Sequence, residues 1–460
     1  MDVIAAIATG SAATAIGIVR VSGDGCFALC GRVFRAAGGR PFAAQEPRKM
    51  VFGEMLDRAG RVIDRGLAVR FPGPGSYTGE DCAEFHCHGS PVVLRELLSA
   101  LFAAGARQAQ AGEFTKRAFL NGRMDLTQAE AVVDLIDAET AAAARNAAAQ
   151  LDGGLRRVLE PVQEELLEVT SRFYAVVDYP DEDIEDVRPE EIAAALRDAA
   201  GRLDHLLDTC RRGQVLKSGV RTAIVGRPNA GKSSLLNALA GYDRAIVTDV
   251  PGTTRDTVEE SVLCGGVLLR LIDTAGIRDT EDVVEKLGVE RSRQAVASAE
   301  LVIVLIDGTG DITAEDREIL ELAQTASHYI VADSKSDLLP PGEARVLSLP
   351  RGIREPDAYL AVSSVAPGGL RLLEAAVAKL FHAGDPGEAG SLLTDRRQED
   401  AARRALEAVR RALEGLEAGL TPDAVLTDAE EALEALGELT GRTAKEEIVS
   451  RIFSRFCVGK

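Results

Sequence analysis

The segment at 226–234, which reads G-R-P-N-A-G-K-S-S, constrains the fold more than any other part of the sequence. A strand-like segment at 220–225, V-R-T-A-I-V, precedes it, and an apolar run at 235–239 follows it. This order predicts a strand, a glycine-rich loop and a helix, which is the context that the G-x4-G-K-[ST] motif requires. A glycine turn followed by a chance Lys-Ser pair would not explain these flanks. We therefore expect an α/β domain with a phosphate-binding loop.

The residue types in this loop suit a nucleoside triphosphate. Gly226 and Gly231 let backbone N–H groups close around the phosphates, and Lys232 brings positive charge to the β and γ oxygens. The Ser233 hydroxyl can bind Mg²⁺. The other loop residues that we assign to nucleotide contact are Asn229, Ala230 and Ser234.

A second nucleotide element, Asp273-Thr274-Ala275-Gly276, follows an expected strand at 268–272. Asp273 can hold Mg²⁺ through water, and the Gly276 N–H can sense the γ-phosphate. The order and spacing of the two motifs predict a nucleotide-hydrolysing domain.

The sequence S-K-S-D at 334–337 predicts that the base is guanine. An Asp337 carboxylate can accept both donor hydrogens of guanine's N1/N2 edge, a pair that adenine does not offer. GTPases usually read N-K-x-D here, and Ser334 stands in place of the Asn beside Lys335. Its shorter hydroxyl predicts one contact that is weaker by about 1 kcal/mol. A third loop, usually S-A-K, corresponds to Ser363-Ser364-Val365.

The sequence does not by itself identify the group that positions the attacking water. Ras-like enzymes carry a Gln directly after the second element, and this chain has Ile277 there, which cannot orient water. The loop that follows contains four carboxylates, and composition does not choose among them: Asp279, Glu281, Asp282 and Glu285.

Charge and cysteine usage favour a soluble cytoplasmic protein. The formal net charge is −19, so the chain as a whole does not attract nucleic acid or an anionic membrane. If the protein acts on RNA, a local basic patch or a partner protein must supply the positive charge. Seven cysteines without disulfide spacing suggest reduced thiols. The apolar stretch at 3–19 follows Asp2 and is interrupted by polar residues, so we expect two strands there rather than a signal peptide.

Hydrophobic periodicity divides the chain into four segments. Residues 1–120 mix expected strands at 16–21 and 66–71 with a helix at 92–104, which is typical of an α+β domain. Residues 217–382 alternate apolar strands and helices. Residues 121–216 and 383–460 show helical spacing, so we expect the α/β domain to be inserted into one helical domain. The helical faces are defined by Leu155, Val158, Leu159, Val162, Leu166 and Val169, and by Leu426, Ala429, Leu433 and Leu436. The acid-rich stretch at 178–191 is expected to be a solvated connector rather than a cation-binding loop.

Several motifs outside the nucleotide elements are more specific. They are S-Y-T-G-E-D at 76–81, E-F-H-C-H-G at 84–89, G-E-F-T-K-R-A-F-L-N-G-R at 112–123, T-D-V-P-G-T-T-R-D at 248–256 and R-I-F-S-R-F-C-V-G-K at 451–460. Together, and in this order, they resemble the MnmE (TrmE) family of tRNA uridine-modification GTPases over the whole chain.

The resemblance implies an architecture and an activity. It implies a tetrahydrofolate-binding N-terminal domain that dimerises, a helical domain split by the GTPase domain, and an FAD-dependent partner subunit, in a heterotetramer. Such a complex adds an aminomethyl or carboxymethylaminomethyl group to C5 of the wobble uridine of certain tRNAs. The one-carbon unit would come from 5-formyl- or methylene-tetrahydrofolate.

The resemblance also implies roles for individual residues of the GTPase domain. The implied potassium ligands are Asn229, Thr248, Val250 and Thr253, and Thr254 joins Ser233 as an Mg²⁺ ligand. Asp249, Pro251 and Gly252 complete the nucleotide-contacting loop. Glu285 takes the position of the family's water-orienting glutamate. A K⁺ ion there would place positive charge near the β- and γ-phosphates, between GTPase domains paired across a dimer.

For folate, the resemblance points to Arg20, Glu84, Arg123 and Lys460. A carboxylate can accept from the pterin's donors, and cations can meet the glutamate tail. The turn at 9–14 differs from the proline- and glycine-rich turn of the family. Cys457 lies in the C-V-G-K tail and is a candidate catalytic residue, although a free cysteine is more often a small buried hydrophobe.

The group Cys82, His86, Cys87 and His88 invites a zinc interpretation. Strand alternation would place His86 and Cys87 on opposite faces, and no second ligand pair has zinc-site spacing, so we expect no metal there.

Two other classes of GTPase remain as alternatives. A ribosome-assembly or RNA-binding switch GTPase is expected to have a basic C-terminal module that binds RNA. The C-terminal segment of this sequence is instead helical and of mixed charge. A self-assembling mechanical GTPase is expected to have a membrane-binding patch, and the sequence does not show one.

Overall fold

The computed structural model describes residues 2–10, 12–178, 188–242, 260–272, 293–339, 352–381 and 389–459. The chain forms two compact units. The first comprises residues 1–133, 159–189 and 411–460, and the second comprises residues 134–158 and 190–410. Each unit is described separately.

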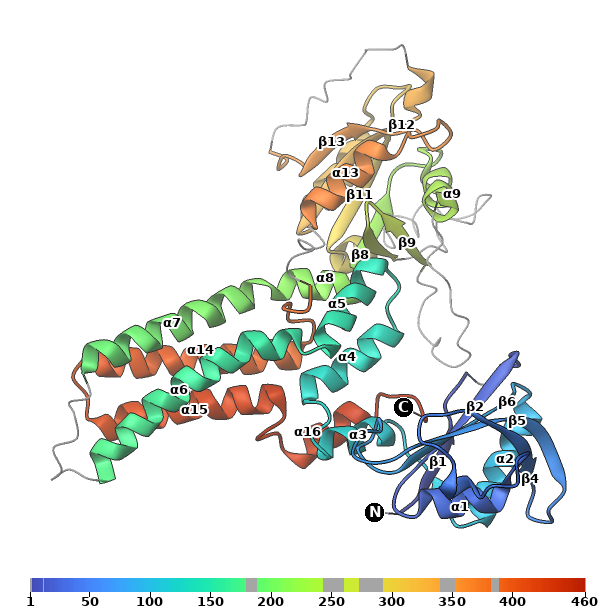
Figure 1. The fold of residues 1–460 in the computed structure, drawn as a ribbon. Coiled ribbons are helices and arrows are strands. Elements are labelled where there is room, and N and C mark those ends of the chain that lie inside the picture. The colour runs from blue at the N-terminus through green and yellow to red at the C-terminus, as the bar shows by residue number, and fades with distance from the viewer. Residues whose placement is uncertain are drawn as a thin grey trace. The chain divides into compact units, whose positions relative to one another are not determined.

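The first unit begins with a seven-stranded sheet in the order β3-β4-β5-β6-β2-β1-β7 (Figure 1). Neighbouring strands are antiparallel, apart from the parallel pair of β1 and β7. The strands are β1 Ile4–Ile7, β2 Ile16–Ser22, β3 Phe34–Ala36, β4 Val51–Leu56, β5 Val62–Phe71, β6 Cys82–His88 and β7 Arg107–Gln108. The accompanying helices are α1 Cys26–Val33, α2 Pro91–Ala103 and α3 Glu113–Leu120, with a short 3₁₀ turn at Phe42–Ala44.

One face of this sheet carries the main core, because alternate strand residues point to it. Val19 and Val21 of β2 pack there with Phe85 of β6 and with Leu94 and Leu97 of α2. The expected strands at 16–21 and 66–71 and the helix at 92–104 are confirmed, and the stretch at 3–19 does form two strands. Sequence periodicity had not indicated α1, β3 or β4.

The opposite face of the sheet is covered over β1, where a smaller cluster is buried. Ile4 and Ala6 pack against Ala109 and Phe114, and the Tyr77 ring lies against them. The same face continues across β2, β6, β5 and β4, where Ile16 and Phe52 are more than half exposed. This sheet therefore has one closed face and one partly open face.

The C-terminal residues pack on the N-terminal segment within the same unit. Val449, Phe453 and Phe456 form a core with Leu126 and Ala129. The last residues continue along the sheet domain, with a bridge between Ala111 and Val458. The helices that form this core are α4 Leu126–Ile136 and α16 Glu446–Phe453, and α15 Pro422–Thr440 precedes α16 in the chain.

Helix α6, Gly154–Asp178, confirms the periodicity read from the sequence. Leu155, Leu159, Val162, Leu166 and Val169 are all buried. On α15, Leu426, Ala429 and Leu436 are buried and Leu433 is half-buried. The connector at 178–191 falls mostly outside the described residues.

The second unit contains a six-stranded sheet in the order β13-β12-β11-β8-β10-β9. The pairs along β13-β12-β11-β8-β10 are parallel, and β9 joins as an antiparallel edge strand. The strands are β8 Val220–Val225, β9 Glu260–Cys264, β10 Val267–Leu271, β11 Leu301–Asp307, β12 His328–Ser334 and β13 Ala358–Ala361. The helices beside them are α9 Lys232–Tyr242, α12 Ala314–Ala323 and α13 Arg371–Leu380.

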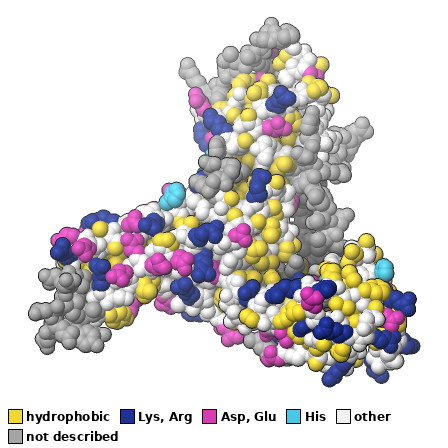
Figure 2. Space-filling model, viewed as in Figure 1, with side chains coloured by type: hydrophobic (Ala, Val, Ile, Leu, Met, Phe, Trp, Pro, Cys, Tyr) yellow, Lys and Arg dark blue, Asp and Glu magenta, His cyan; other side chains and the backbone are white. Residues whose placement is uncertain are grey.

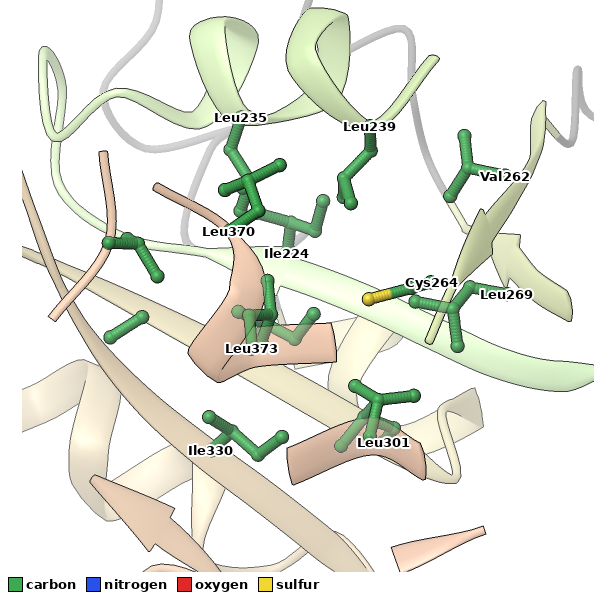
Figure 3. Close-up of a cluster of buried hydrophobic side chains, with 14 of the residues drawn as sticks. Ile224, Leu235, Leu239, Val262, Cys264, Leu269, Leu301, Ile330, Leu370 and Leu373 are labelled. Atoms are coloured by element: carbon green, nitrogen blue, oxygen red, sulfur yellow. The ribbon is translucent and has the colours of Figure 1, made fainter. Parts of the chain in front are cut away.

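Helices α9 and α13 bury one face of this sheet. Figure 3 shows Leu235 and Leu239 of α9 and Leu373 of α13 directed at the sheet residues Ile224 and Leu301. α12 contributes Leu320 and Ala323 to the core on the other face. The helix–sheet–helix layering confirms the α/β domain expected from the alternating pattern.

The chain leaves this sheet and returns to helices of the same unit. Gly390 N–H donates to Asn146 Oδ1 at 2.9 Å, and Leu393 N–H donates to Thr209 Oγ1 at 3.1 Å. The helices are α5 Ala141–Leu151, α7 Pro189–Asp208, α8 Cys210–Ser218 and α14 Arg396–Glu417. Because helical segments precede and follow the sheet and hydrogen-bond to each other, the α/β domain is inserted in a helical domain. The limits at 120, 216 and 382 remain predictions.

Within the parts of the chain that the structure describes, no helix combines the length and the apolar character needed to cross a bilayer.

Candidate nucleotide site and the N-terminal side-chain cluster

The loop between β8 and α9 has backbone geometry that its sequence explains. Gly231 has φ +97°, which a side chain would oppose, and Asn229 has φ +63°, in the left-handed region that Asn tolerates better than most residues. A Cβ on Gly226 would stand 2.5 Å from the Leu305 carbonyl oxygen of β11, so this close approach requires glycine. The loop is therefore shaped as a phosphate-binding turn at the carboxyl edge of the parallel strands.

Lys232 is the first residue of α9, and its side chain folds back over the loop. Its Nζ donates to the Gly226 and Arg227 carbonyl oxygens, at 2.6 and 2.9 Å. Burial lowers the pKa of Lys232 from its ordinary value. The ammonium thus lies on the inner side of the turn, where the motif needs positive charge for phosphate oxygens.

Ser334 ties the base-recognition loop to the phosphate loop. It is buried, and its hydroxyl donates to the Ala230 carbonyl oxygen at 2.6 Å and lies 3.1 Å from the Ile306 carbonyl oxygen. The sequence had suggested a weaker contact at this position. In the structure the short hydroxyl reaches the backbone of Ala230 directly, so it joins β12, β11 and the phosphate loop.

Lys335 has φ +59°, and an ion pair accompanies this unusual backbone. Its Nζ lies 2.7 Å from Asp307 Oδ2 at the end of β11. Burial of Asp307 raises its pKa, but hydrogen bonds from Lys335 and Thr309 outweigh burial and bring that pKa to about 2. Asp307 is therefore a charged anchor for the base-recognition loop, and the sequence analysis had missed it. Its position directly after the buried strand 301–306 was the available signal.

Asp337 and Ser363 come from different loops and meet at the same edge. The Ser363 hydroxyl donates to Asp337 Oδ1 at 2.6 Å and accepts from the backbone N–H groups of Val365 and Ala366. This contact orients the carboxylate that we assign to guanine. The structure therefore bonds Ser334 to Ala230 and Ser363 to Asp337. The assignment of these residues, with Lys335 and Ser364, to nucleotide contact remains a prediction.

Several predicted site residues lie outside the described residues, so their roles remain predictions. They are Thr248, Asp249, Val250, Pro251, Gly252, Thr253, Thr254, Asp273, Thr274, Ala275, Gly276, Glu285 and Lys460, and the same holds for Ile277.

The N-terminal sheet places Arg20 and Glu84 side by side on its partly open face. They are cross-strand partners on β2 and β6, and Arg20 Nε donates to Glu84 Oε1 at 2.9 Å. The Arg20 guanidinium lies over the rings of Tyr77 and Phe114, at 5.2 and 5.8 Å from their centroids. Tyr77 and Phe114 were not assigned from the sequence, although both belong to motifs that carried the family resemblance.

His86 follows Glu84 on the same face of β6. Its Nε2 is 3.4 Å from Glu84 Oε2 and has no hydrogen-bond partner among the described residues, although that atom is inaccessible to solvent. A buried polar atom without a partner is uncommon and calls for an explanation such as a ligand or water. The cluster of Arg20, Glu84 and His86 is thus bordered by two aromatic rings, and its side chains could hold a flat polar ligand.

A buried ion network fixes the loop that carries Tyr77. The Arg117 side chain is 5 % exposed and donates to Glu80, Glu113 and Asp2, at 3.0, 3.0 and 2.8 Å. A buried guanidinium needs such partners, since an unpaired one would be costly. Asn121 Nδ2 also donates to the Thr78 carbonyl oxygen at 2.7 Å. The loop at 76–81 is therefore held from two sides.

The other predicted folate residues lie elsewhere on this domain. Arg123 is exposed, and its side chain borders Gly79 in the same loop as Tyr77. Cys457 is an exposed thiol, and its carbonyl oxygen accepts from the Gly112 N–H at 3.4 Å. The structure thus joins Arg20 with Glu84 directly, and it places Arg123 and Cys457 beside other parts of the domain.

The Cys-His group divides between the two faces of β6, as alternation predicted. Cys87 is in the main core, where burial raises its pKa to about 11, whereas His86 lies beside Glu84 on the other face. His88 contacts Asp64 at 2.9 Å. Among the described residues, no group of three or more His, Cys, Asp and Glu side chains is placed to hold a metal ion.

The parallel sheet, the shaped loop before α9 and the S-K-S-D loop define a P-loop GTPase domain. Two family models match the chain, the "MnmE helical domain" over residues 126–457 and the "GTP-binding protein TrmE N-terminus" over residues 3–123.

Curated relatives match over the full chain. The tRNA modification GTPase MnmE of Symbiobacterium thermophilum is 45 % identical over 100 % of this chain and 99 % of its own. That of Lactobacillus delbrueckii subsp. bulgaricus is 44 % identical over 100 % and 98 %. The chain belongs to the MnmE (TrmE) family of tRNA modification GTPases, and it is accordingly a GTP-hydrolysing enzyme of tRNA modification.

Solved structures resemble parts of the chain. A single-residue variant of Aquifex aeolicus Era bound to GDP·AlF4⁻ is 27 % identical, with coverage of 41 % of this chain and 66 % of that chain and a TM-score of 0.28. The G domain of the T. maritima FeoB iron transporter is 24 % identical, with coverage of 35 % and 97 % and a TM-score of 0.25.

Proposed function

We propose that this protein is the GTP-hydrolysing subunit of a complex that adds an aminomethyl or carboxymethylaminomethyl group to C5 of the wobble uridine of tRNA. The one-carbon unit would come from tetrahydrofolate, and an FAD-dependent partner subunit would supply the redox chemistry. The observation that carries this proposal is the end-to-end match to both family models and to full-length relatives named for tRNA modification.

Guanine nucleotide would bind at the loop before α9. Lys232 would contact the β- and γ-phosphates, and Asp337, oriented by Ser363, would accept from the guanine edge. Ser233 and Thr254 would hold Mg²⁺, which screens phosphate charge during hydrolysis. Asp273 would hold it through water, and Gly276 would contact the γ-phosphate.

Potassium would complete the site when GTPase domains pair in a homodimer. Asn229, whose left-handed backbone lies at the turn of the loop, would be one ligand, with Thr248, Val250 and Thr253. The ion supplies positive charge near the transferred phosphoryl group. Glu285, which takes the position of the family's water-orienting glutamate, would orient the attacking water in place of the Gln that Ile277 replaces.

Folate would bind on the partly open face of the N-terminal sheet. Glu84 would accept from the amino and amide donors of the pterin, and the Arg20 ion pair holds its carboxylate in position. The buried Nε2 of His86 offers a polar partner in the same cluster. Arg123 and Lys460 would meet the glutamate tail, and Cys457 is a candidate catalytic thiol near the C-terminus.

The proposed assembly is a heterotetramer of two copies of this chain and two flavoprotein subunits, acting on tRNA in the cytoplasm. The net charge of −19 supports a partner that carries much of the RNA contact.

The decisive test is nucleoside analysis of tRNA from a strain that lacks this gene. We expect the modified wobble uridines to disappear and to return when the gene is supplied on a plasmid. A Glu84→Gln gene should not restore them. Unchanged wobble uridines in the deletion strain would overturn the assignment and favour a switch GTPase without one-carbon chemistry.

Hydrolysis assays test the nucleotide mechanism separately. GTP turnover should rise strongly in K⁺ compared with Na⁺, and Glu285→Ala should retain GTP binding but lose most turnover. Equal rates in the two salts would remove Asn229 as an ion ligand, and near-normal turnover of the variant would remove Glu285.

A further inference from the structure

The loops assigned to the guanine base differ from the usual GTPase loops at two positions, and both changes remove hydrogen-bond donors. Ser334 stands in place of the usual Asn, and Val365 stands in place of the usual Lys of the S-A-K loop. An Asn amide carries two N–H hydrogens and a Lys ammonium carries three, whereas a serine hydroxyl carries one and a valine side chain carries none. These loops are therefore poorer in side-chain donors than the usual ones.

The single hydrogen of the Ser334 hydroxyl is committed to the protein backbone. The side chain is buried, and its oxygen lies 2.6 Å from the Ala230 carbonyl oxygen and 3.1 Å from that of Ile306. Both neighbours are acceptors, so the hydrogen points at one of them. The side chain also lies against the phosphate loop, because a Cβ on Gly231 would stand 3.8 Å from the Ser334 oxygen. The hydroxyl thus has no hydrogen left to donate to a base.

The Asp337 carboxylate is suited to one edge of guanine only. It is an acceptor with about four lone-pair positions, and the Ser363 hydroxyl takes one of them at 2.6 Å from Oδ1. The others suit the N1–H and N2–H donors of guanine. The remaining edge of guanine offers the acceptors O6 and N7, which need donors from the protein. Lys335, the neighbouring cation, is held by Asp307 at 2.7 Å.

Apolar side chains border the same loops. Leu338 directly follows Asp337 and is 67 % exposed, and Val365 is 82 % exposed. Figure 2 shows further hydrophobic side chains on the surface of the α/β domain, with charged groups scattered among them. An apolar side chain does not distinguish a C–H group from a nitrogen acceptor by hydrogen bonding, because it bonds to neither.

We propose that this enzyme selects its nucleotide through the N1/N2 donor edge and does not read N7, so that it also accepts 7-deazaguanine nucleotides, in which C–H replaces N7. Ser334 is the specificity-determining residue. A site built to donate to an atom rejects the analogue that lacks it, since the buried donor is then left unpaired, and a site without that donor does not. The inference rests on the proposed contact between Asp337 and guanine.

Competition against a ribose-labelled fluorescent GDP on the full-length protein tests the proposal. The wild type should bind 7-deaza-GDP and GDP with affinities that agree within about twofold. Ser334→Asn should bind GDP at least as tightly, because one amide hydrogen can keep the bond to Ala230 while the other is available to N7. This variant should prefer GDP over 7-deaza-GDP about fivefold. The matched control is Ser327→Asn, at an exposed position just before the other end of β12, and it should show no preference.

A wild-type preference for GDP over 7-deaza-GDP of about fivefold or more would overturn the proposal, because a donor would then reach N7. So would equal binding of the two nucleotides by Ser334→Asn, which would remove residue 334 from base selection.

Inosine diphosphate, which lacks the 2-amino group, separates this inference from the function on which it rests. The wild type should bind it at least about tenfold more weakly than GDP, because a hydrogen bond to the Asp337 carboxylate is lost. Equal affinities for inosine diphosphate and GDP would remove Asp337 from the base contact, and the proposed guanine site would fail whatever the result with 7-deaza-GDP. Weak binding of inosine diphosphate together with rejection of 7-deaza-GDP would leave the guanine site standing and overturn this inference alone.

Discussion

The two candidate sites of this protein are built in different ways. The nucleotide site is made largely of backbone at the carboxyl edge of a parallel sheet, with Gly226 and Gly231 permitting its geometry and Ser334 bonding to the carbonyl of Ala230. The N-terminal site is made of side chains that come from separate strands of an antiparallel sheet, with Arg20 and Glu84 at its centre. A site made of backbone should tolerate many side-chain changes, whereas a site made of side chains should be sensitive to each of its members.

The largest effect should come from Lys232, whose ammonium lies within the phosphate-binding loop. Lys232→Ala removes the ammonium held inside the loop, and we expect GTP affinity to fall at least about 100-fold, because charge-assisted contacts to phosphate are strong. Folate affinity should be unchanged. Isothermal titration with each ligand measures both, and a parallel loss of folate binding would indicate general misfolding instead.

Glu84→Gln should have the next largest effect, and on the other site. The change leaves Arg20 without its carboxylate partner and removes an acceptor for pterin donors. We expect folate affinity to fall about 30-fold, roughly 2 kcal/mol, with kcat and KM for GTP unchanged in K⁺ and Mg²⁺ buffer. A control is Glu46→Gln, an exposed carboxylate paired only with Lys49 three residues away among the described contacts. Normal folate binding by Glu84→Gln would contradict the side-chain model of the site.

Ser334→Ala should have a smaller effect, because the phosphate loop keeps its own backbone geometry. The loss of one buried hydrogen bond to Ala230 should reduce GDP affinity about fivefold, or roughly 1 kcal/mol. Ser334→Asn should retain affinity, since the usual GTPase residue offers the same donor. If Ser334→Ala binds GDP as the wild type does, the hydroxyl does not connect the two loops in solution.

The smallest effect concerns acid stability. Burial of Glu113 raises its pKa, but hydrogen bonds from Arg107, the Gln110 N–H and Arg117 outweigh burial and bring it to about 2. A lowered pKa stabilises the fold above about pH 4.5, and that stability is lost as the pH falls towards 2. Glu113→Gln should therefore cost roughly 1 kcal/mol at pH 7, after allowance for solvent screening, and should flatten the loss below pH 4.5. Urea unfolding followed at pH 7 and pH 3 measures this, and equal pH dependence of variant and wild type would contradict it.

The same contrast explains how much could be predicted from the sequence. The nucleotide loops are continuous motifs, so strand β8, Lys232 and the S-K-S-D loop could be located from spacing alone. Arg20 and Glu84 are 64 residues apart in the chain, and nothing local to either residue indicates the other. They could be assigned only through the family resemblance.

Other residues could not be identified from the sequence, because their role depends on tertiary packing. The rings of Tyr77 and Phe114 contact Arg20 only in the folded domain. Arg117 holds the loop at 76–81, which carries Tyr77. Strands β3 and β4 and helix α1 are short, and their half-buried patterns give weak periodicity. Strands β3 and β4 extend the partly open face of the sheet, which follows from the strand register.

The bridge between Ala111 and Val458 has a consequence for synthesis on the ribosome. The N-terminal sheet is translated well before the residues that pack beside Gly112 and against the carbonyl of Ile7, where Gly459 leaves no room for a Cβ. One edge of this sheet therefore stays uncovered until those residues have been translated. A purification tag placed next to Gly459 would be held against that edge, so a tag elsewhere in the chain is the better choice for measuring folate binding.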